Sequence, residues 1–496
     1  MEELKQSRAE PMAQHTLGLK HIKVKTDDFH EEGEEPLSPY GAIFCNPLLD
    51  AYILIIMGLN KPVHVPSMKT ALQSVLSKHK RFSSTVTESD WGNRKWVRKE
   101  FDIDEHIKEV ELSEKYRESA DFVEKFTASL ATASPPEPSI PLWQIYVLNY
   151  RSAEAEASVV FKIHHCIGDC VSLMSLFLDC TRQTSCPESM PTIRSLQKGN
   201  NSPPWTLTAT LQKMWTVIFS LWCTALTLLH AFATLLWFKD GRMVRGRQNL
   251  SSHPRRLAHV TVDLKDIAIV KKAINGTVND VVAGMLSAGF VRYFNRLRSK
   301  DGEHSKTPRI RALVPVNIRS SGGLHKMEEM MKNGKKARWG NAFGMWILPI
   351  EVKQQQQYLE YCRLAKDQSD MKKASFEAPF THSFVDLLLR LFGWQAPAAV
   401  TLRMLYNTTL VFSNVLGPLE QVQLLDNPVS HIVTTVSGLP QGLVVHFQSY
   451  AGKAKFIAMA ADKIFSEPDK LCMDCAYGLS QMKKEALLLN DNTSNN

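Results

Sequence analysis

The sequence predicts an α/β protein with two halves of mixed strands and helices joined by a long crossover. Short apolar runs and segments with helical apolar spacing alternate along both halves of the 496-residue chain. Glycine-containing turns separate these segments, which favours layers of sheet and helix over a bundle of helices. Residues 214–238, between the two halves, contain no charged side chain.

The composition is that of a globular chain, with 44% apolar and 22% charged residues. The net charge of +9 is spread out, without the dense basic clusters that a nucleic-acid surface needs, so we expect no nucleic-acid partner. It suits a phosphorylated small molecule or an anionic membrane surface. The nine cysteines are scattered, the CxxC of Cys472 and Cys475 stands alone, and the N-terminus lacks the apolar core of a signal peptide. We therefore expect a reduced compartment, no disulfide framework and no metal site.

The first half contains the expected elements in a regular order. The first 35 residues form a polar and acidic tail, and an N-terminal domain covers 36–200. Met68, Ala71, Leu72, Val75 and Leu76 share one face of a helix expected over 66–79. The remaining expected elements of this half are strands over 51–59, 95–101, 142–150 and 157–165, a helix over 170–182 and a loop over 183–204.

The crossover, residues 201–256, holds the most unusual stretch of the chain. At about 1.5 Å per residue, a helix over 214–238 is long enough to cross a hydrocarbon layer of about 30 Å. Trp215, Trp222 and Trp237 suit membrane interfaces, and basic residues follow the stretch. We expect this helix to contact a membrane, and the alternative is a helix buried in the protein core.

The second half, assigned as a C-terminal domain over 257–483 with a tail over 484–496, again alternates strands and helices. For 384–400, which contains Asp386 and Arg390, we favour a core helix over a second membrane patch. The other expected elements are strands over 259–264, 310–318, 341–350, 408–418, 431–439 and 442–461 and a helix over 277–294.

Two adjacent histidines end the apolar run 157–165, and Asp169 follows. Because strand side chains alternate between faces, His164 and His165 must point in opposite directions, which disfavours a shared metal ion. One imidazole can instead act as a general base. In the alternative interpretation both rings are structural, and Asp169 caps the helix that begins at about Cys170. Both interpretations fit the residues.

The stretch "HHCIGDC" resembles the HHxxxDG signature of the wax ester synthase/diacylglycerol acyltransferase family and the wider HxxxD signature of acyl-CoA-dependent acyltransferases. Six further stretches stand in the order found in plant-type members. They are "PLSP", "PLW", "TVNDVV", "PVNIR", "GNAFG" and "SNVLGP". The resemblance implies two chloramphenicol-acetyltransferase-like domains with the active site in a channel between them.

The resemblance also implies roles for individual residues. His165 would be the general base, and Asp169 would pair with Arg319 to fix the turn that carries it. His164 would support the motif. Asn279 and Asp280 match a family pair, although Thr277 and Asp280 also form a possible capping box. The family motif implies a supporting role for the pair Ser413 and Asn414, and Asn279 or the Ser413 hydroxyl is a candidate oxyanion donor.

The implied activity is transfer of an acyl group from acyl-CoA to a long-chain fatty alcohol, and also to diacylglycerol, with no permanently bound cofactor. Both halves must meet at one site, so a single full crossing by 214–238 is excluded. We expect a helix or bent hairpin that stays in one leaflet or on the surface. The family implies the cytosolic face of the endoplasmic reticulum, with the plasma membrane as the alternative.

Two other functions remain open. In one, the same fold uses a non-lipid alcohol. In the other, Cys170, which stands where the family signature has glycine, marks a weakened site that only binds lipid.

Overall fold

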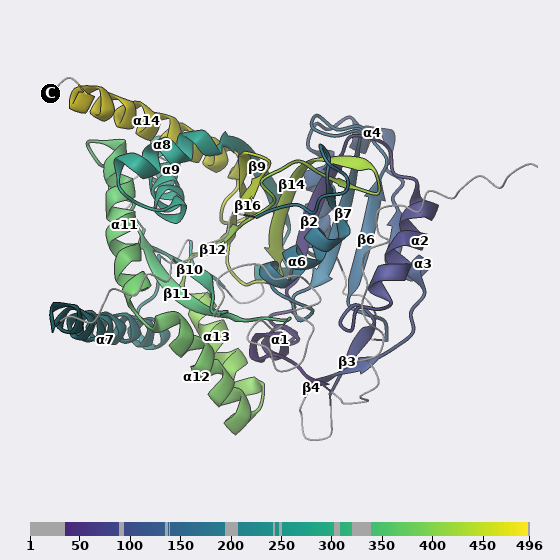
Figure 1. Ribbon diagram of the computed structural model, residues 1–496, viewed down its shortest axis with the longest axis horizontal. Coiled ribbons are helices and arrows are strands. Elements are labelled where there is room, and N and C mark those ends of the chain that lie inside the picture. Colours follow the sequence, from purple (N-terminus) through teal and green to yellow (C-terminus); the bar gives the residue numbers. More distant parts are fainter. Residues whose placement is uncertain are drawn as a thin grey trace, which may run out of the picture.

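We describe a computed structural model of the chain, shown as a ribbon in Figure 1. The structure describes residues 35–88, 94–133, 137, 139–193, 207–241, 244–247, 250–301, 308–319 and 339–494. The predicted tail over 1–35, except for Glu35, and much of the predicted loop over 183–204 lie outside these residues.

The first sheet has seven strands in the order β5-β6-β7-β2-β14-β13-β8. β2 and β7 are almost continuously apolar and pair antiparallel at its centre, because both of their faces are covered. The strands are β2 (Tyr52–Leu59), β5 (Ile107–Glu109), β6 (Trp143–Leu148), β7 (Ala157–His164), β8 (Arg182–Gln183), β13 (Val422–Leu424) and β14 (Asn427–Ser437).

The second sheet has six strands in the order β11-β10-β12-β15-β16-β9. One face packs on four helices, and the other faces the first domain. The four are α8 (Leu264–Ala273), α9 (Val278–Asp301), α11 (Tyr358–Ala374) and α14 (Pro468–Ser494). Its strands are β9 (Arg255–Asp263), β10 (Ile310–Asn317), β11 (Phe343–Ile350), β12 (Leu410–Val415), β15 (Leu443–Tyr450) and β16 (Lys453–Ala461). A small third sheet joins β1 (Glu35–Pro36), β3 (Ser84–Glu88) and β4 (Arg94–Arg98).

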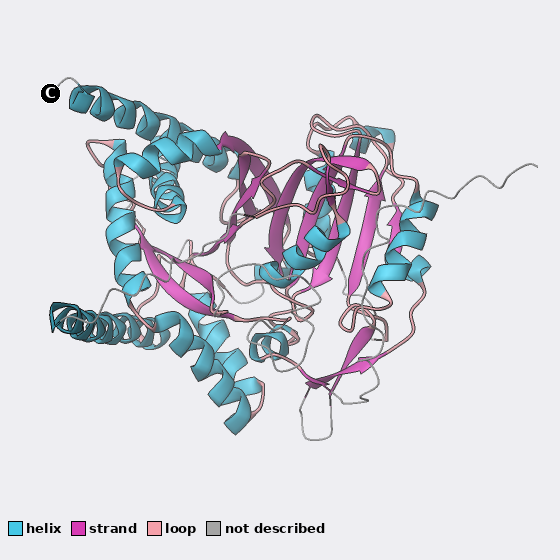
Figure 2. Ribbon diagram, viewed as in Figure 1, coloured by secondary structure: helices cyan, strands magenta, loops and turns pink. Residues whose placement is uncertain are grey.

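Helices pack around both large sheets, as Figure 2 shows. In the first half they are α1 (Pro39–Phe44), α2 (Val65–Leu76), α3 (Ile103–His106), α4 (Glu114–Arg117), α5 (Phe122–Leu130) and α6 (Cys170–Cys180). From the crossover onward they are α7 (Leu207–Leu236), the 3₁₀ turn η3 (Leu250–Ser252), α8 (Leu264–Ala273), α9 (Val278–Asp301), α11 (Tyr358–Ala374), α12 (Glu377–Phe392), α13 (Gln395–Asn407) and α14 (Pro468–Ser494). The apolar face predicted for 66–79 is buried in α2.

The pairing of strands differs from the predicted division of the chain into an N-terminal and a C-terminal domain. β13 and β14 lie within the stretch 257–483 but belong to the first sheet, where β14 pairs with β2 over its length. The backbone of β14 completes the hydrogen bonding of β2, so the two halves share a sheet.

The crossover helix α7 is one continuous helix that packs beside α11, α12 and α13 on the second domain (Figure 1). A bent hairpin is therefore excluded. α7 is apolar and long enough to cross a membrane, yet only 11% of its most apolar window is buried. Trp215, Trp222 and Trp237 are 70%, 62% and 72% exposed, so α7 is not a core helix. Membrane contact itself stays a prediction.

The expectation of a core helix over 384–400 was wrong. In α12 only Glu377, Ala378 and Val385 are buried, whereas Leu387, Leu391 and Phe392 are exposed. Asp386 and Arg390 form an exposed ion pair one helical turn apart. The two charges therefore satisfy each other at the surface and do not require a buried environment.

The expected C-terminal tail over 484–496 was also wrong, because α14 continues to Ser494. Glu485 accepts hydrogen bonds from the backbone N–H groups of Tyr358 and Leu359, both 2.8 Å long. These donors open α11, so a carboxylate from α14 satisfies the free N–H groups of a neighbouring helix.

Candidate active site

His165 lies in the turn between β7 and α6, where the two domains meet. Its backbone N–H donates to the carbonyl oxygen of Ala51 at 2.8 Å, which holds the turn against the start of β2. The ring lies 4.3 Å from the Phe44 ring and 6.2 Å from the Phe343 ring, measured between centroids. Phe44 ends α1 and Phe343 begins β11, so both halves of the chain enclose this imidazole.

Asn341 fixes which ring nitrogen of His165 carries the proton. The Asn341 Nδ2 donates to the backbone carbonyl oxygen of His165 at 2.8 Å, which sets the orientation of the amide. The Asn341 Oδ1 therefore faces the Nδ1 of His165, 3.0 Å away, and can only accept from it. Nδ1 is the protonated nitrogen, and no described residue hydrogen-bonds to Nε2, so its lone pair can take a proton.

Burial keeps the His165 ring neutral. His165 is only 9% exposed, and this burial lowers the pKa of its imidazole from 6.5 to about 4. The nearby carboxylate of Asp169 and the hydrogen bond to Asn341 oppose the shift but do not cancel it. At neutral pH the imidazole is therefore unprotonated, as a general base must be before it acts.

The predicted contact between Asp169 and Arg319 is present as a bidentate ion pair. Nη1 and Nη2 of Arg319 donate to the two carboxylate oxygens of Asp169 at 2.8 and 3.1 Å, and both side chains are buried. Asp169 also accepts from the backbone N–H of Ser172 at 3.0 Å, so it caps α6 as well. The motif aspartate thus fixes the turn and the helix together, and it does not contact His165 directly.

A segment from the second half, 339–342, wraps this turn. The Trp339 indole N–H donates to the carbonyl oxygen of Ile167 at 2.7 Å, and the backbone N–H of Ala342 donates to Asp169 at 3.0 Å. Sequence reasoning noted "GNAFG" as a shared stretch but gave Asn341 and Trp339 no role. An asparagine in an irregular loop has no periodicity from which its contact with residue 165 could be inferred.

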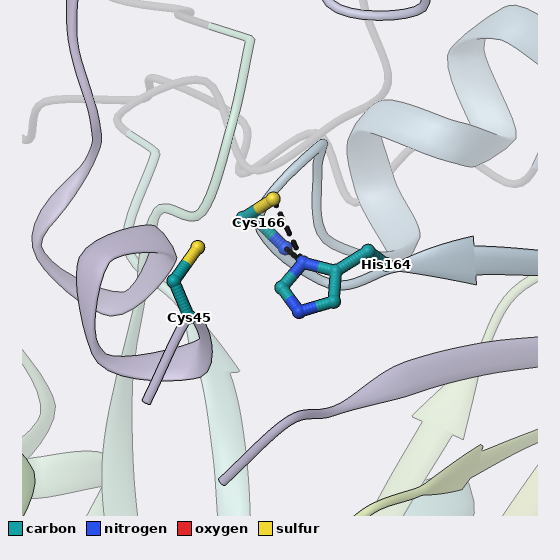
Figure 3. A group of neighbouring side chains, drawn as sticks. All are labelled: Cys45, His164 and Cys166. Atoms are coloured by element: carbon teal, nitrogen blue, oxygen red, sulfur yellow. Dashed lines mark hydrogen bonds between the residues drawn. The ribbon is translucent and has the colours of Figure 1, made fainter. Parts of the chain in front are cut away.

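His164 points to the other side, as the alternation of the strand predicts. Its Nε2 lies 3.0 Å from a carboxylate oxygen of Asp50, and its Nδ1 lies 2.8 Å from the sulfur of Cys166. Figure 3 shows His164 with Cys166 and with Cys45, whose sulfur belongs to the same group of possible ligand atoms, all within 4.8 Å of one another. We refer to Cys45, His164 and Cys166 as the thiol–imidazole cluster.

The predicted pair Asn279 and Asp280 separates into two environments. Asp280 is fully buried, accepts from the backbone N–H of Thr277 at 2.7 Å and pairs with Lys373 at 3.1 Å. The backbone N–H of Asp280 donates to the Thr277 hydroxyl at 3.4 Å, so Thr277 and Asp280 form the capping box that opens α9. Asn279 is exposed and accepts a 2.6 Å hydrogen bond from Asn414, which links α9 to β12.

Ser413 lies on the face of the second sheet that looks toward the first domain. It is paired in register with His446 on the neighbouring parallel strand, so the two side chains share this face. His446 is buried, and its Nδ1 has no hydrogen-bond partner in the described part of the chain. Burial and the nearby His165 lower the pKa of His446 to about 3. Sequence reasoning did not single out this second imidazole.

Cys170 is the first residue of α6, so its backbone is helical and its φ angle is not positive. A cysteine in place of the signature glycine therefore causes no backbone strain, because this position does not adopt the left-handed conformation. Cys170 lines an apolar cavity of about 110 Å³ between α6, α2 and the first sheet. Ile53, Phe161, Met174 and Val415 are among the other lining residues.

Comparisons with known proteins agree with this architecture. The family model described as the wax ester synthase/diacylglycerol acyltransferase catalytic domain matches residues 57–282, and the WS/DGAT C-terminal domain matches 339–483. Among curated proteins, wax ester synthase/diacylglycerol acyltransferase 11 of Arabidopsis thaliana is 32% identical over 92% of this chain and 96% of its own length. Wax ester synthase/diacylglycerol acyltransferase 5 of the same plant is 34% identical over 91% of this chain and 94% of its own length.

Solved structures share the fold at low sequence identity. The wax ester synthase/diacylglycerol acyltransferase from Marinobacter aquaeolei VT8 has a TM-score of 0.58 at 16% identity, covering 91% of this chain and 99% of that one. The first condensation domain of the calcium-dependent antibiotic synthetase has a TM-score of 0.57 at 11% identity, covering 92% and 96%. The predicted α/β fold of two acyltransferase-type domains with one long apolar helix is confirmed. By its family models and its plant relatives, the chain belongs to the wax ester synthase/diacylglycerol acyltransferase family.

Proposed function

We propose that this acyltransferase transfers a fatty acyl group from acyl-CoA to the hydroxyl of a long-chain alcohol, forming wax esters, and also to diacylglycerol, forming triacylglycerol. The observation that carries the proposal is the state of His165. It is an uncharged imidazole between two domains, with Nδ1 bound to Asn341 and the Nε2 lone pair free. A base in this state suits a hydroxyl nucleophile at neutral pH.

The mechanism we propose is a single displacement. Nε2 of His165 takes the proton of the alcohol as its oxygen attacks the thioester carbonyl carbon. The resulting oxyanion would be stabilised by the hydroxyl of Ser413 or the amide of Asn279. When the carbon–sulfur bond breaks, the proton on His165 passes to the departing CoA thiolate. Every step uses side chains of the protein itself, with acyl-CoA as co-substrate and no resident cofactor or metal ion.

The apolar cavity supports a lipid substrate over a polar one. Aliphatic and aromatic side chains from α2, α6 and the first sheet line it, and Cys170 and Val415 connect it to the elements around the motif turn and β12. A hydrocarbon chain is stabilised there by about 25 cal/mol for each Å² of apolar surface removed from water. A polar acceptor would gain nothing from such a lining.

The test is turnover of labelled palmitoyl-CoA with a panel of acceptors that includes hexadecanol, diolein and a phenolic alcohol. We expect ester formation with hexadecanol and diolein. Transfer to the phenolic alcohol alone would replace the lipid proposal with a non-lipid acceptor. Binding of acyl-CoA without any transfer would indicate a weakened, lipid-binding homologue.

We also propose that the protein works at the cytosolic face of the endoplasmic reticulum, with the plasma membrane as the alternative address. Support comes from the exposed apolar surfaces of α7 and α12, which lie together on the second domain, where Thr224 of α7 accepts from the Phe376 N–H at 2.9 Å. Such a surface gains free energy by entering lipid without crossing it. Tags at both termini should be digested by protease in intact vesicles, and protection of one tag alone would exclude a one-sided arrangement.

A further inference from the structure

The thiol–imidazole cluster lies at the end of β7, on the opposite side from the His165 ring. Cys166 is buried and Cys45 is partly exposed. The sulfur atoms of Cys45 and Cys166 lie within 4.8 Å of each other, and the Cys166 sulfur lies 2.8 Å from Nδ1 of His164 (Figure 3). Two cysteines that are 121 positions apart in the sequence numbering, 45 and 166, are thus brought close together by the fold.

The orientation of His164 argues against a metal ion in this cluster. The backbone N–H of Cys166 donates to Nδ1 of His164 at 3.2 Å, so the lone pair that a metal ion would need is already in use. Nε2 of the same ring faces Asp50. A structural zinc site takes four ligands, and the described residues bring only three together.

We propose that Cys45 and Cys166 are a redox modification site, in which a hydroperoxide converts the two thiols into a reversible disulfide that displaces His165. The effect on catalysis rests on the proposed function, whereas formation of the disulfide does not. The sulfur atoms are already neighbours, so the bond requires a local closing movement and no rearrangement of the sheets.

The two thiols have different reactivities. The neighbouring Cys166 thiol, with smaller contributions from His164 and Arg94, lowers the pKa of Cys45 from 9.0 to about 7, although burial opposes this. Burial raises the pKa of Cys166 well above 9.0. Cys45 is therefore the attacking thiolate, because reactivity follows thiolate character and exposure, and Cys166 is the resolving thiol.

The reaction balances with hydrogen peroxide as the oxidant. The Cys45 thiolate attacks one peroxide oxygen, the O–O bond breaks, and the leaving hydroxide takes a proton to become water. The Cys166 sulfur then attacks the sulfur of the resulting sulfenic acid, and the Cys166 thiol proton passes to the departing hydroxide, which leaves as water. Two thiols lose two electrons and two protons, and the peroxide becomes two molecules of water. A dithiol such as dithiothreitol reverses the reaction.

The disulfide would displace His165 because each of its two cysteines is next in the chain to a residue of the active site. Cys45 follows Phe44, whose ring lies 4.3 Å from the His165 ring, and Cys166 follows His165 in the chain. Drawing the two sulfur atoms together moves the end of α1 and the motif turn toward each other. A displacement of the base by about 1 Å costs on the order of 10²-fold in rate.

The experiment treats the full-length protein in detergent with hydrogen peroxide and follows two quantities in parallel. Peptide mass spectrometry should detect a linked pair containing Cys45 and Cys166, and transfer activity should fall by about 10²-fold as the link forms and return with dithiothreitol. Cys45→Ser should keep its activity in peroxide. The exposed Cys186 offers a matched control, because Cys186→Ser should behave like the unsubstituted protein.

Three outcomes would overturn the inference. One is peroxide treatment that modifies Cys186 while Cys45 and Cys166 stay unlinked. Another is a stoichiometric metal ion that protects both thiols from alkylation. The third is a quantitative disulfide that leaves activity unchanged, which would reject the effect on His165. Absence of transfer activity under reducing conditions would count against the proposed function, and the linked peptide would still be measurable.

Discussion

His164 and His165 are neighbours in the chain, but the fold gives them two different environments. Both imidazoles are buried and both have a partner on Nδ1. His164 is fixed at both ring nitrogens, by Cys166 and by Asp50. Within the part of the chain that the structure describes, His165 is fixed at Nδ1 alone, by an asparagine from the second half of the chain.

This difference shows how one motif serves structure on one side and chemistry on the other. A ring held at both nitrogens orients the turn and has no lone pair to offer. A ring held at one nitrogen is oriented and still available as a base.

The largest effect is expected for His165→Ala, which should lower kcat/KM by about 10²–10⁴-fold because the base is lost. Thermal unfolding should change little. His164→Ala is the matched control, and it should lower the unfolding temperature while retaining more activity, because it leaves Asp50 without its partner. Equal losses of activity in the two variants would erase the distinction between the two rings.

Breaking the ion pair behind the turn is expected to act on stability. Arg319→Ala leaves the Asp169 charge buried and should cost about 3–5 kcal/mol of unfolding free energy. Arg319→Lys keeps the charge but loses the bidentate contact, so it should damage the protein about as much as Asp169→Asn. Arg390→Ala is the control, because its exposed pair with Asp386 is worth less than about 1 kcal/mol. A silent Arg319→Lys variant would reject the clamp.

Asn341→Ala should reduce kcat by roughly 10²-fold, because it releases the ring and its tautomer. Asn341→Asp retains an acceptor for Nδ1 and places a negative charge beside the ring, so it should restore part of the activity. The same charge should raise the pKa of His165 and move the acidic limb of the pH–rate profile upward. A purely structural role for Asn341 would leave the pH profile unmoved.

The dependence of stability on pH should report the buried neutral histidines. Burial lowers the pKa values of His79, His165 and His446 from 6.5 to between about 3 and about 4. Below pH 6.5 the unfolded chain takes up protons that the folded chain refuses, so the free energy of unfolding falls as the pH drops toward 4. Chemical denaturation between pH 4 and 8 measures this slope. His446→Asn should make it shallower, and an unchanged slope would show that this ring is not neutral in the fold.

The smallest effect is expected for Cys170→Gly. A glycine in the first turn of α6 should cost about 1 kcal/mol or less. The wider cavity should shift chain-length preference toward longer chains by about tenfold at most, measured as kcat/KM over a series of acyl-CoA substrates. A gain of activity far above this would show that the cysteine weakens the enzyme.

Much of the fold could be predicted from the sequence, because buried strands and amphipathic helices have periodic patterns. β2, β7 and α2 lie close to where apolar runs and spacing indicated. The motif gave His165, Asp169 and Arg319. The contacts of Asn341 and His446 could not be predicted, because they depend on the packing of two distant segments. The extension of α14 past residue 483 could not be predicted for a similar reason, because Glu485 stabilises it through a contact with the distant helix α11.

The shared first sheet has a consequence for how the chain is made. During translation β2 and β7 leave the ribosome long before β14, which fills the remaining edge of β2. At roughly 5–20 residues per second, the strand "YILIIMGL" waits with an open, apolar edge until residue 437 has been synthesised. Such an edge is a template for aggregation, so we expect a nascent chain of this protein to aggregate less when a chaperone covers β2 until β14 has been synthesised.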